Sequence, residues 1–240
     1  MTAPALAVSG VGKTFTMHLQ DGQRLPVLSG LTFDVRPGEC VALGGSSGAG
    51  KSSVLKMVYG NYAADRGTIL LRGPRGTTDI VTANPRQVLA ARRHTMAYVS
   101  QFLHCVPRVG ALQIVAEPLI QRGVPAGQAR ARAAELLTRL SVPRRLWQLP
   151  PATFSGGEQQ RVNIARGLVV DLPVLLLDEP TASLDDRNRD VVTGLIRDKR
   201  DRGTALLGIF HDTPVREAVA DRVVDVEAFA ATPAAATAVA

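Results

Sequence analysis

The chain has 240 residues, of which 45% are hydrophobic, and a formal net charge of +7. This length suits one α/β domain, or one domain with an inserted lobe, and the composition supplies a sizeable core. We expect neither an integral membrane segment nor a signal peptide, because no apolar run has the length of a membrane span and the amino terminus lacks a basic stretch followed by an apolar one.

Cysteine and charge also narrow the class of protein. Cys40 and Cys105 are far apart in the sequence, which favours free thiols in a reducing cytoplasm. Most of the positive charge comes from arginines scattered along the chain. This pattern favours a solvated surface or a protein partner over nucleic acid.

The first part of the chain predicts strands followed by a loop and a helix. Strands are expected at residues 6–8, 13–20, 24–28, 31–35 and 40–43, with a hairpin turn at Asp21-Gly22. A glycine-rich loop follows at once, then a helix over residues 51–59. The stretches 68–71 and 79–81 predict an edge hairpin, and residues 96–100 predict another core strand.

The middle of the chain predicts helices, and the last part returns to an α/β pattern. Helices are expected over residues 111–121, 126–140 and 157–169, within a lobe of about 102–170. Strands at 174–177, 205–210 and 222–226 then alternate with helices at 187–200 and 214–220. The predicted fold is α/β, with a mixed β core, an antiparallel β subdomain and an inserted α-helical lobe. It occupies residues 1–227, and an Ala-rich tail that we expect to be disordered follows over 228–240.

The glycine-rich loop predicts a phosphate site. Its residues are Gly45, Ser46, Ser47, Gly48, Ala49, Gly50, Lys51, Ser52 and Ser53. Backbone N–H groups freed by the glycines can wrap a β-phosphate, and Lys51 can reach the β- and γ-phosphate oxygens. Ser52 is a candidate ligand of Mg²⁺. A strand before the loop and a helix after it provide the context that such a motif requires.

Two carboxylates end the apolar strand at 174–177. Asp178 is a candidate for holding Mg²⁺ or its water shell, and Glu179 for the general base that polarises an attacking water. Alone, two acids after a strand are usually a solvated loop. A phosphate loop in the same sheet favours the catalytic interpretation.

Two further strand ends carry polar residues of interest. Gln101 follows the strand at 96–100, where its amide can contact Mg²⁺ or the attacking water. His211 follows the strand at 205–210, where it can hydrogen-bond a γ-phosphate or the water held by Glu179. A lone histidine is more often structural.

The run Ser155-Gly156-Gly157-Glu158-Gln159-Gln160-Arg161 predicts a second anion site. A turn that enters a helix presents free N–H groups and the positive end of the helix dipole. One nucleotide needs two such sites only if each of two subunits supplies half of them. Asp185 follows the acidic strand and can face a partner's phosphate loop. Phe15 is a candidate for stacking on adenine, with core packing as the alternative.

Together these motifs resemble the ATP-binding-cassette ATPases over nearly the whole chain. The resemblance implies the P-loop NTPase fold, ATP and Mg²⁺ as ligands, and a homodimer, or a heterodimer with a sister cassette, that encloses two ATP molecules. Phe154 and Glu158 depart from the family's Leu-Ser-Gly-Gly-Gln. Glu158 brings a negative charge near the facing nucleotide.

Several longer stretches resemble one branch of that family, the L component of the bacterial carbon–phosphorus lyase system. They are residues 24–28, 59–62, 99–103, 107–108, 142–147, 153–167 and 208–212. This resemblance implies a cytoplasmic subunit that assists phosphonate degradation together with carbon–phosphorus lyase core components.

Two alternatives remain open. Residues 102–120 also resemble cassettes of lipoprotein-release and macrolide-export type, which implies the nucleotide-binding subunit of a membrane transporter, peripheral to the inner membrane. A DNA-associated cassette rests only on the basic charge, and the long coiled-coil insertions typical of that class are absent from the sequence.

Overall fold

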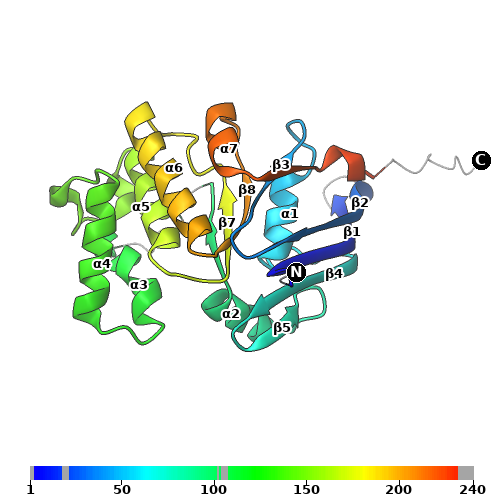
Figure 1. The fold of residues 1–240 in the computed structure, drawn as a ribbon, viewed down its shortest axis with the longest axis horizontal. Coiled ribbons are helices and arrows are strands. Elements are labelled where there is room, and N and C mark those ends of the chain that lie inside the picture. Colours follow the sequence, from blue (N-terminus) through cyan, green and yellow to red (C-terminus); the bar gives the residue numbers. More distant parts are fainter. Residues whose placement is uncertain (1–2, 18–21, 102, 104–107, 232–240) are drawn as a thin grey trace, which may run out of the picture.

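The computed structural model describes residues 3–17, 22–101, 103 and 108–231, which form two β-sheets with helices packed against them (Figure 1). One sheet is antiparallel, in the order β2-β1-β4-β5. The other is parallel, in the order β6-β7-β8-β3-β9. The predicted α/β class, with an antiparallel subdomain beside a parallel core, is confirmed.

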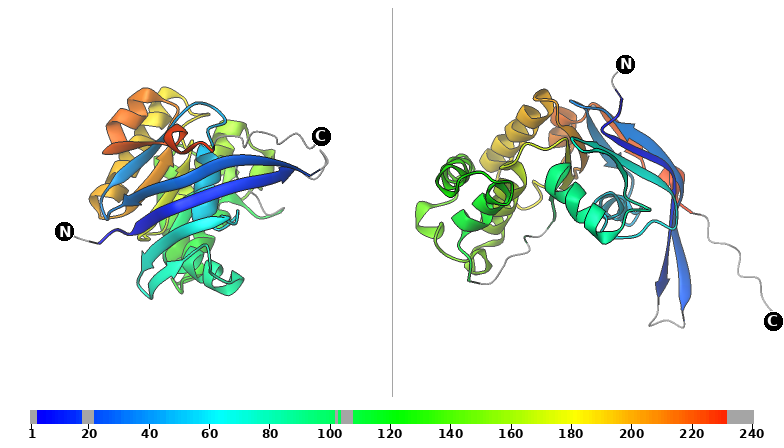
Figure 2. Two further views of the ribbon diagram at one scale, coloured as in Figure 1. Left: turned by 90° about the vertical axis from the view of Figure 1, so that its right-hand side faces the viewer. Right: turned by 90° about the horizontal axis from the view of Figure 1, so that it is seen from below.

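The antiparallel sheet consists of β1 (Leu6–Met17), β2 (Gln23–Val35), β4 (Arg66–Gly73) and β5 (Gly76–Asp79). The sequence predicts β1 and β2 as shorter, separate strands, which is wrong. Register shifts and the positive φ of Gly10 (61°) let β1 bend without ending. The two strands form a long hairpin that projects from the body (Figure 2). Asp21 of the predicted turn lies outside the described residues.

The parallel sheet contains β3 (Cys40–Gly44), β6 (Met96–Val99), β7 (Val174–Asp178), β8 (Ala205–Ile209) and β9 (Arg222–Asp225). Its inner strands β3, β7 and β8 are almost wholly apolar because they are covered on both faces, whereas the edge strand β9 carries Arg222 and Asp225 at its ends. On β7, Leu175 and Leu177 pack into the core on the side of the helical lobe. Val174 and Leu176 point the other way, into the core shared with the antiparallel sheet.

Helices complete the layers around the parallel sheet. α1 (Lys51–Val58) shares one core with both sheets, and α6 (Asp186–Asp201) and α7 (Thr213–Val219) belong to the other core. α3 (Ala111–Ile120), α4 (Ala126–Arg139) and α5 (Gly156–Leu168) pack together as a helical lobe, at the left of Figure 1. Short 3₁₀ turns cover Arg144–Leu146, Pro151–Thr153 and Glu227–Phe229.

One helix has no counterpart in the sequence-based prediction. α2 (Pro85–His94) begins at Asn84, whose side chain accepts from Gln87 N at 3.0 Å while the Gln87 side chain accepts from Asn84 N at 2.8 Å. This reciprocal cap, with proline in the first turn, is a recognisable start signal. Ala91 is its sole buried residue among those described, so α2 lacks the apolar stripe on which periodicity depends.

The last described residues attach to β2. Ala230 forms a bridge with Leu28, and Ala231 N donates to Val27 O at 3.2 Å. The Ala-rich segment expected from residue 228 therefore starts against the antiparallel sheet. Residues 232–240 lie outside the described part of the chain.

Candidate functional site

The phosphate loop lies between the end of β3 and the start of α1. Gly45, Gly48 and Gly50 have φ values of 120°, 88° and 92°. Glycine alone adopts such angles without strain, so the loop needs these residues for its curvature. A Cβ at Gly48 would meet no atom within 4 Å, which leaves open space beside the loop. The loop thus presents backbone N–H groups at a helix start to an open side, as an anion site requires.

Lys51 is the cation of this loop, and its side chain folds back across it. Its Nζ donates to Gly45 O at 2.7 Å and to Ser46 O at 2.6 Å. The residue is only 9% exposed. The ammonium group is therefore held over the loop, where a phosphate oxygen could replace a carbonyl partner.

A carboxylate that sequence reasoning missed supports the base of the loop. Glu227 Oε1 accepts from Ser46 N at 2.5 Å, and Glu227 N donates to Asp225 Oδ1 at 3.0 Å. The hydrogen bonds from Ser46 and the nearby charge of Lys51 lower the pKa of Glu227. No motif marks this residue, because only the fold brings the end of the chain back to the loop.

Asp178 ends β7 beside the phosphate loop. Its Oδ1 accepts from Ser52 Oγ at 3.2 Å, and its Oδ2 accepts from Tyr98 OH at 2.7 Å. Asp178 is 3% exposed, and burial together with the Asp178 charge raises the pKa of Tyr98. The structure thus brings together Ser52 and Asp178, two of the three predicted metal residues, and adds Tyr98, which sequence reasoning missed.

Glu179 and His211 meet at the ends of neighbouring strands. His211 Nε2 lies 2.8 Å from Glu179 Oε1, and Glu179 N donates to Ile209 O at 3.1 Å. Glu179 has a φ of 51°, a conformation that non-glycine residues rarely adopt. Such strain persists only where the surrounding contacts impose it, and it often accompanies function.

Gln101 follows β6 and is exposed. Among the described contacts, none joins Gln101 to Asp178 or Glu179.

Phe15 lies on β1 near the phosphate loop. Phe15 pairs with Leu25 on β2. Two residues further along β2, Val27 packs against the loop, because a Cβ built at Gly50 would lie 2.9 Å from Val27 Cγ1. Its ring packs edge-on against Tyr62, with centroids 5.4 Å apart. Phe15 is half-buried and therefore is not a core residue. Tyr62 is a second aromatic residue beside it that sequence reasoning missed.

Ser155 caps the first turn of α5. Ser155 Oγ accepts from Glu158 N at 3.4 Å, and Glu158 Oε2 accepts from Ser155 N at 2.9 Å and from Ser155 Oγ at 2.7 Å. These bonds to Ser155 lower the pKa of Glu158. The carboxylate of Glu158 is thus turned back onto its own helix start as a capping group. The N–H groups of Gly156 and Gly157, in the first turn, have no acceptor within the helix.

Side chains of α5 fasten it to the two strands of the site. Asn163 Nδ2 donates to Ser100 O at 2.5 Å, directly after β6, and Gln160 Nε2 donates to Pro180 O at 3.2 Å, after β7. A Cβ on Gly157 would lie 3.2 Å from Ser183 O, so the Ser-Gly-Gly turn adjoins the segment before α6. Asp185 caps α6 by accepting from Asn188 N at 2.8 Å, and this bond lowers its pKa.

The donor set suits Mg²⁺ held together with a nucleotide. Ser52 and Asp178 offer hydroxyl and carboxylate oxygens, which hard cations prefer. Mg²⁺ usually takes one or two protein oxygens and completes its shell with water and phosphate. Among the described residues, no group of three or more His, Cys, Asp or Glu could hold a metal ion.

Three features define a P-loop nucleotide-binding protein: a glycine-rich loop between a strand and a helix, a buried aspartate on the next strand but one, and a glutamate directly after it that pairs with a histidine. The family model described as ABC transporter matches residues 28–182. The chain therefore belongs to the ABC transporter family, as an ATP-binding-cassette ATPase domain. The predicted family and enzyme class are confirmed.

Curated relatives refine the comparison. The chain is 42% identical to the lipoprotein-releasing system ATP-binding protein LolD of Maricaulis maris, over 81% of this chain and 83% of the relative. It is 38% identical to LolD of Alcanivorax borkumensis, over 83% of this chain and 86% of the relative. It is 37% identical to the macrolide export ATP-binding/permease protein MacB of Brucella melitensis, over 93% of this chain but only 33% of that longer protein.

These relatives overturn the narrower prediction from sequence. They carry lipoprotein-release and macrolide-export names, so the assignment to the L component of the carbon–phosphorus lyase system, with its phosphonate role and lyase partners, is wrong. The stretches that suggested it include family motifs, such as residues 153–167 and 208–212, which surround the nucleotide site. Motifs of that kind indicate the ATPase chemistry that the family shares, and they do not distinguish one partner protein from another.

Solved structures agree on the fold. The dimeric structure of MJ0796, a bacterial ABC transporter cassette, superposes with a TM-score of 0.82 at 25% identity, over 92% of this chain and 95% of that one. A second structure of MJ0796, a dimer in a post-hydrolysis state bound to ADP and Pi, superposes equally well. Within the described ranges, we find no helix both long and apolar enough to span a membrane.

Proposed function

We propose that this chain is the ATP-binding and ATP-hydrolysing subunit of a membrane transporter of the lipoprotein-release and macrolide-export type. The observation that carries the proposal is the 42% identity to a LolD protein over four-fifths of both chains. The site geometry supports the chemistry, because the residues needed for phosphate, Mg²⁺ and water converge at one edge of the parallel sheet.

The phosphate loop would bind the β- and γ-phosphates, with Lys51 as the point charge. Residues 45–53 supply the N–H groups, and Phe15 with Tyr62 would form the platform for adenine. Ser52 and Asp178 would hold Mg²⁺ directly or through water, and Gln101 would join them when the lobe moves. Mg²⁺ neutralises the charge that develops on the phosphates.

Glu179 would act as the general base that accepts a proton from the attacking water. Its Oε1 already has a partner in His211 at 2.8 Å, which fixes the carboxylate at the strand end. In this role His211 orients the carboxylate and reaches toward the γ-phosphate. General bases of this kind contribute about 10²–10⁴-fold to a rate.

Two cassettes would enclose ATP between them, as a homodimer or with a sister cassette. The N–H groups of Gly156 and Gly157 would face the γ-phosphate bound to the partner, and Ser155 would contribute its hydroxyl after release from Glu158. Asp185 would lie near the partner's phosphate loop. Support comes from the dimeric MJ0796 structures, which share this fold.

The cassette would comprise residues 1–227, with the helical lobe at about 102–170, and would act at the cytoplasmic side of the inner membrane. Affinity capture of the tagged chain from detergent-solubilised native membranes tests the transporter assignment. We expect an integral membrane protein with several spans to co-purify and to raise the ATPase rate. Capture of soluble proteins alone, with no stimulation by any membrane component, contradicts the assignment.

A further inference from the structure

Residues 226–231, which we call the strap, follow β9 and connect the phosphate loop with β2. The strap begins at Val226, whose N–H donates to Gly44 O at 3.1 Å, directly before the loop. At Ala231 its N–H donates to Val27 O at 3.2 Å. Figure 1 shows the strap in red beside β2. It therefore joins the strand that leads into the loop to the edge of the antiparallel sheet.

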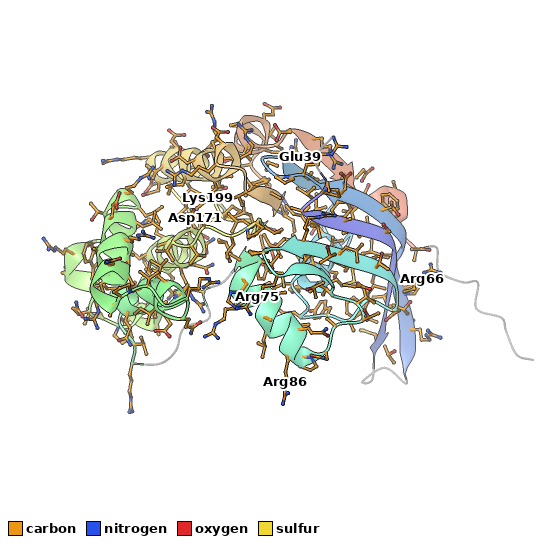
Figure 3. The ribbon with its side chains drawn as sticks, turned by 60° about the horizontal axis from the view of Figure 1, so that its bottom comes forward. Glu39, Arg66, Arg75, Arg86, Asp171 and Lys199 are labelled. Atoms are coloured by element: carbon orange, nitrogen blue, oxygen red, sulfur yellow. The ribbon has the colours of Figure 1, made fainter. Side chains whose placement is uncertain are left out.

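The backbone that carries the strap is held firmly in place. β9 pairs with β3 in parallel register as far as Asp225 and Gly44. At the start of β9, Arg222 Nε donates at 2.5 Å to Glu39, which is labelled in Figure 3. Glu227 N donates to Asp225 Oδ1 at 3.0 Å. The side chain of Glu227 thus extends from an anchored backbone, as a positioning group requires.

One peptide unit of the phosphate loop is bonded on both sides. This unit joins Gly45 to Ser46, and it is trans. Its carbonyl oxygen accepts from Lys51 Nζ at 2.7 Å, and its N–H donates to Glu227 Oε1 at 2.5 Å. The C=O and N–H of a planar trans peptide point in opposite directions, so Lys51 and Glu227 lie on opposite sides of it. A carboxylate, a peptide and an ammonium group in series polarise one another, which strengthens both bonds.

The contact between strap and loop is close because the loop begins with a glycine. Gly45 has a φ of 120°, and a Cβ at this position would lie 3.2 Å from Glu227 Cγ. The strap also supports the other end of the loop through β2. Val27 accepts from Ala231, and its Cγ1 would lie 2.9 Å from a Cβ at Gly50. Both ends of the loop thus pack against the strap or against the strand that it pairs with.

A carboxylate beside a phosphate loop can either repel a nucleotide or hold the loop in shape. Lys51, the cation for phosphate, lies on the opposite side of the Gly45–Ser46 peptide from Glu227. Glu227 is also exposed, so water and salt screen its charge from a bound phosphate. The geometry therefore favours a role in shaping the loop.

We propose that Glu227 is a positioning residue of the nucleotide site, which holds the Gly45–Ser46 peptide so that the loop and Lys51 are preorganised for phosphate. When a phosphate oxygen replaces Gly45 O as the partner of Lys51, the bond to Glu227 keeps this peptide from turning. A preorganised loop loses less conformational entropy on binding, so the effect is on phosphate affinity and not on the chemical step. The inference rests on the proposed function and adds a residue to its ATP site.

Three substitutions of Glu227 separate its hydrogen bond from its charge. Glu227→Asp keeps the charge but is one methylene shorter, Glu227→Gln keeps an acceptor oxygen without the charge, and Glu227→Ala removes both. Glu217→Ala, an exposed change on α7 with the same loss of charge, is the control. Inorganic tripolyphosphate with Mg²⁺, and separately adenosine, displace a fluorescent ATP analogue from each purified full chain. Urea unfolding checks that every variant is folded.

We expect Glu227→Ala and Glu227→Asp to bind tripolyphosphate about three- to tenfold more weakly than the wild type, as the net loss of one hydrogen bond implies. Glu227→Gln should stay within about twofold of the wild type, because an amide oxygen can still accept from Ser46 N. Adenosine should bind all the chains equally. In steady-state assays the KM for ATP should rise in Glu227→Ala and Glu227→Asp, while kcat changes by less than about twofold.

Equal affinity of the wild type and Glu227→Asp for tripolyphosphate overturns the inference. Tighter binding by both Glu227→Gln and Glu227→Ala also overturns it, because the charge of Glu227 would then oppose phosphate binding. Equal losses of affinity for tripolyphosphate and adenosine indicate a general structural role and contradict positioning as well. None of these outcomes affects the transporter assignment, which is tested by co-purification with a membrane protein.

Discussion

Tyr98 donates a hydrogen bond of 2.7 Å to Asp178 Oδ2, so both oxygens of this aspartate have partners, the other being Ser52. Burial keeps the phenol protonated by raising its pKa, so the hydroxyl is a donor at any physiological pH. Tyr98 therefore fixes the angle at which Asp178 faces the phosphate loop. It is a positioning residue, since its contact is to the aspartate.

Tyr98→Phe should raise the Mg²⁺ concentration needed for half-maximal ATPase activity and lower kcat, by up to about 10²-fold for the two effects together. The reason is the loss of one hydrogen bond to a charged group, which is worth about 1.5–3 kcal/mol at most. Steady-state assays across a Mg²⁺ titration measure both effects. Tyr59→Phe is the matched control, because its ring packs on Tyr98 with centroids 5.0 Å apart. An unchanged Mg²⁺ dependence in Tyr98→Phe contradicts the positioning role.

Glu179→Gln should reduce hydrolysis by about 10²–10⁴-fold while ATP still binds, because the amide cannot accept the proton from water. Gel filtration with ATP and Mg²⁺ should then show a longer-lived dimer. Glu217→Gln, an exposed change on α7, is the control and should leave both properties intact. Turnover near the wild-type rate in Glu179→Gln would assign the base to another residue.

Glu158→Ala should destabilise the chain by about 0.5–1 kcal/mol, because it removes half of a capping box. Glu158→Gln should retain most of that stability. The folded pKa of Glu158 lies below its ordinary 4.5. Its stabilising contribution is thus complete above about pH 4.5 and disappears as the pH falls through the lower, folded value. Urea unfolding of the three proteins at pH 7 and below pH 4 measures this; equal stability of Glu158→Ala and wild type at pH 7 excludes the cap.

Gly167→Ala and Gly194→Ala should act in opposite directions although both lie in helices. A Cβ at Gly167 would lie 2.3 Å from Val99 Cγ2, in a buried contact, whereas a Cβ at Gly194 would meet no atom within 4 Å. We expect Gly167→Ala to cost about 1–3 kcal/mol and Gly194→Ala to add up to about 1 kcal/mol. The free energy of unfolding from denaturant titration separates them. A stabilised Gly167→Ala would mean that α5 does not press against β6.

The sequence predicts best where the physical signal is local. The phosphate loop, the β7 carboxylates and the start of α5 each depend on residues within about ten positions, and the structure places them in one fold. Asp178 and Ser52 could be paired in advance because parallel strands end at the same edge of a sheet. The structure shows where these residues lie, but the roles predicted for all the site residues toward nucleotide, Mg²⁺ and water stay predictions.

Other contacts between distant segments could not be predicted from the sequence. Glu227 lies 181 positions from Ser46, and no pattern connects the two. In the sequence Tyr98 is one residue of an apolar strand, and no pattern indicates that its hydroxyl contacts Asp178. The six arginines that line one cavity come from the β4–β5 turn, α2, α3 and α5, so the sequence shows only a scattered excess of positive charge: Arg75, Arg86, Arg92, Arg93, Arg122 and Arg166. The prediction of carbon–phosphorus lyase partners was wrong for a related reason. The motifs that are easiest to recognise serve ATP binding and hydrolysis, which all relatives share, and they do not specify the partner.

The hydrogen bonds that attach α5 to Ser100 and Pro180 would couple the two ATP sites of a dimer. The helix that we propose presents its first turn to a neighbour's nucleotide is hydrogen-bonded to the ends of β6 and β7 beside its own nucleotide site. In such a dimer, ATP binding or hydrolysis in one chain would move the first turn of its α5, and this turn would contact the ATP bound to the other chain. We expect the two ATP sites to respond cooperatively, with a Hill coefficient above one that falls toward one in Asn163→Ala.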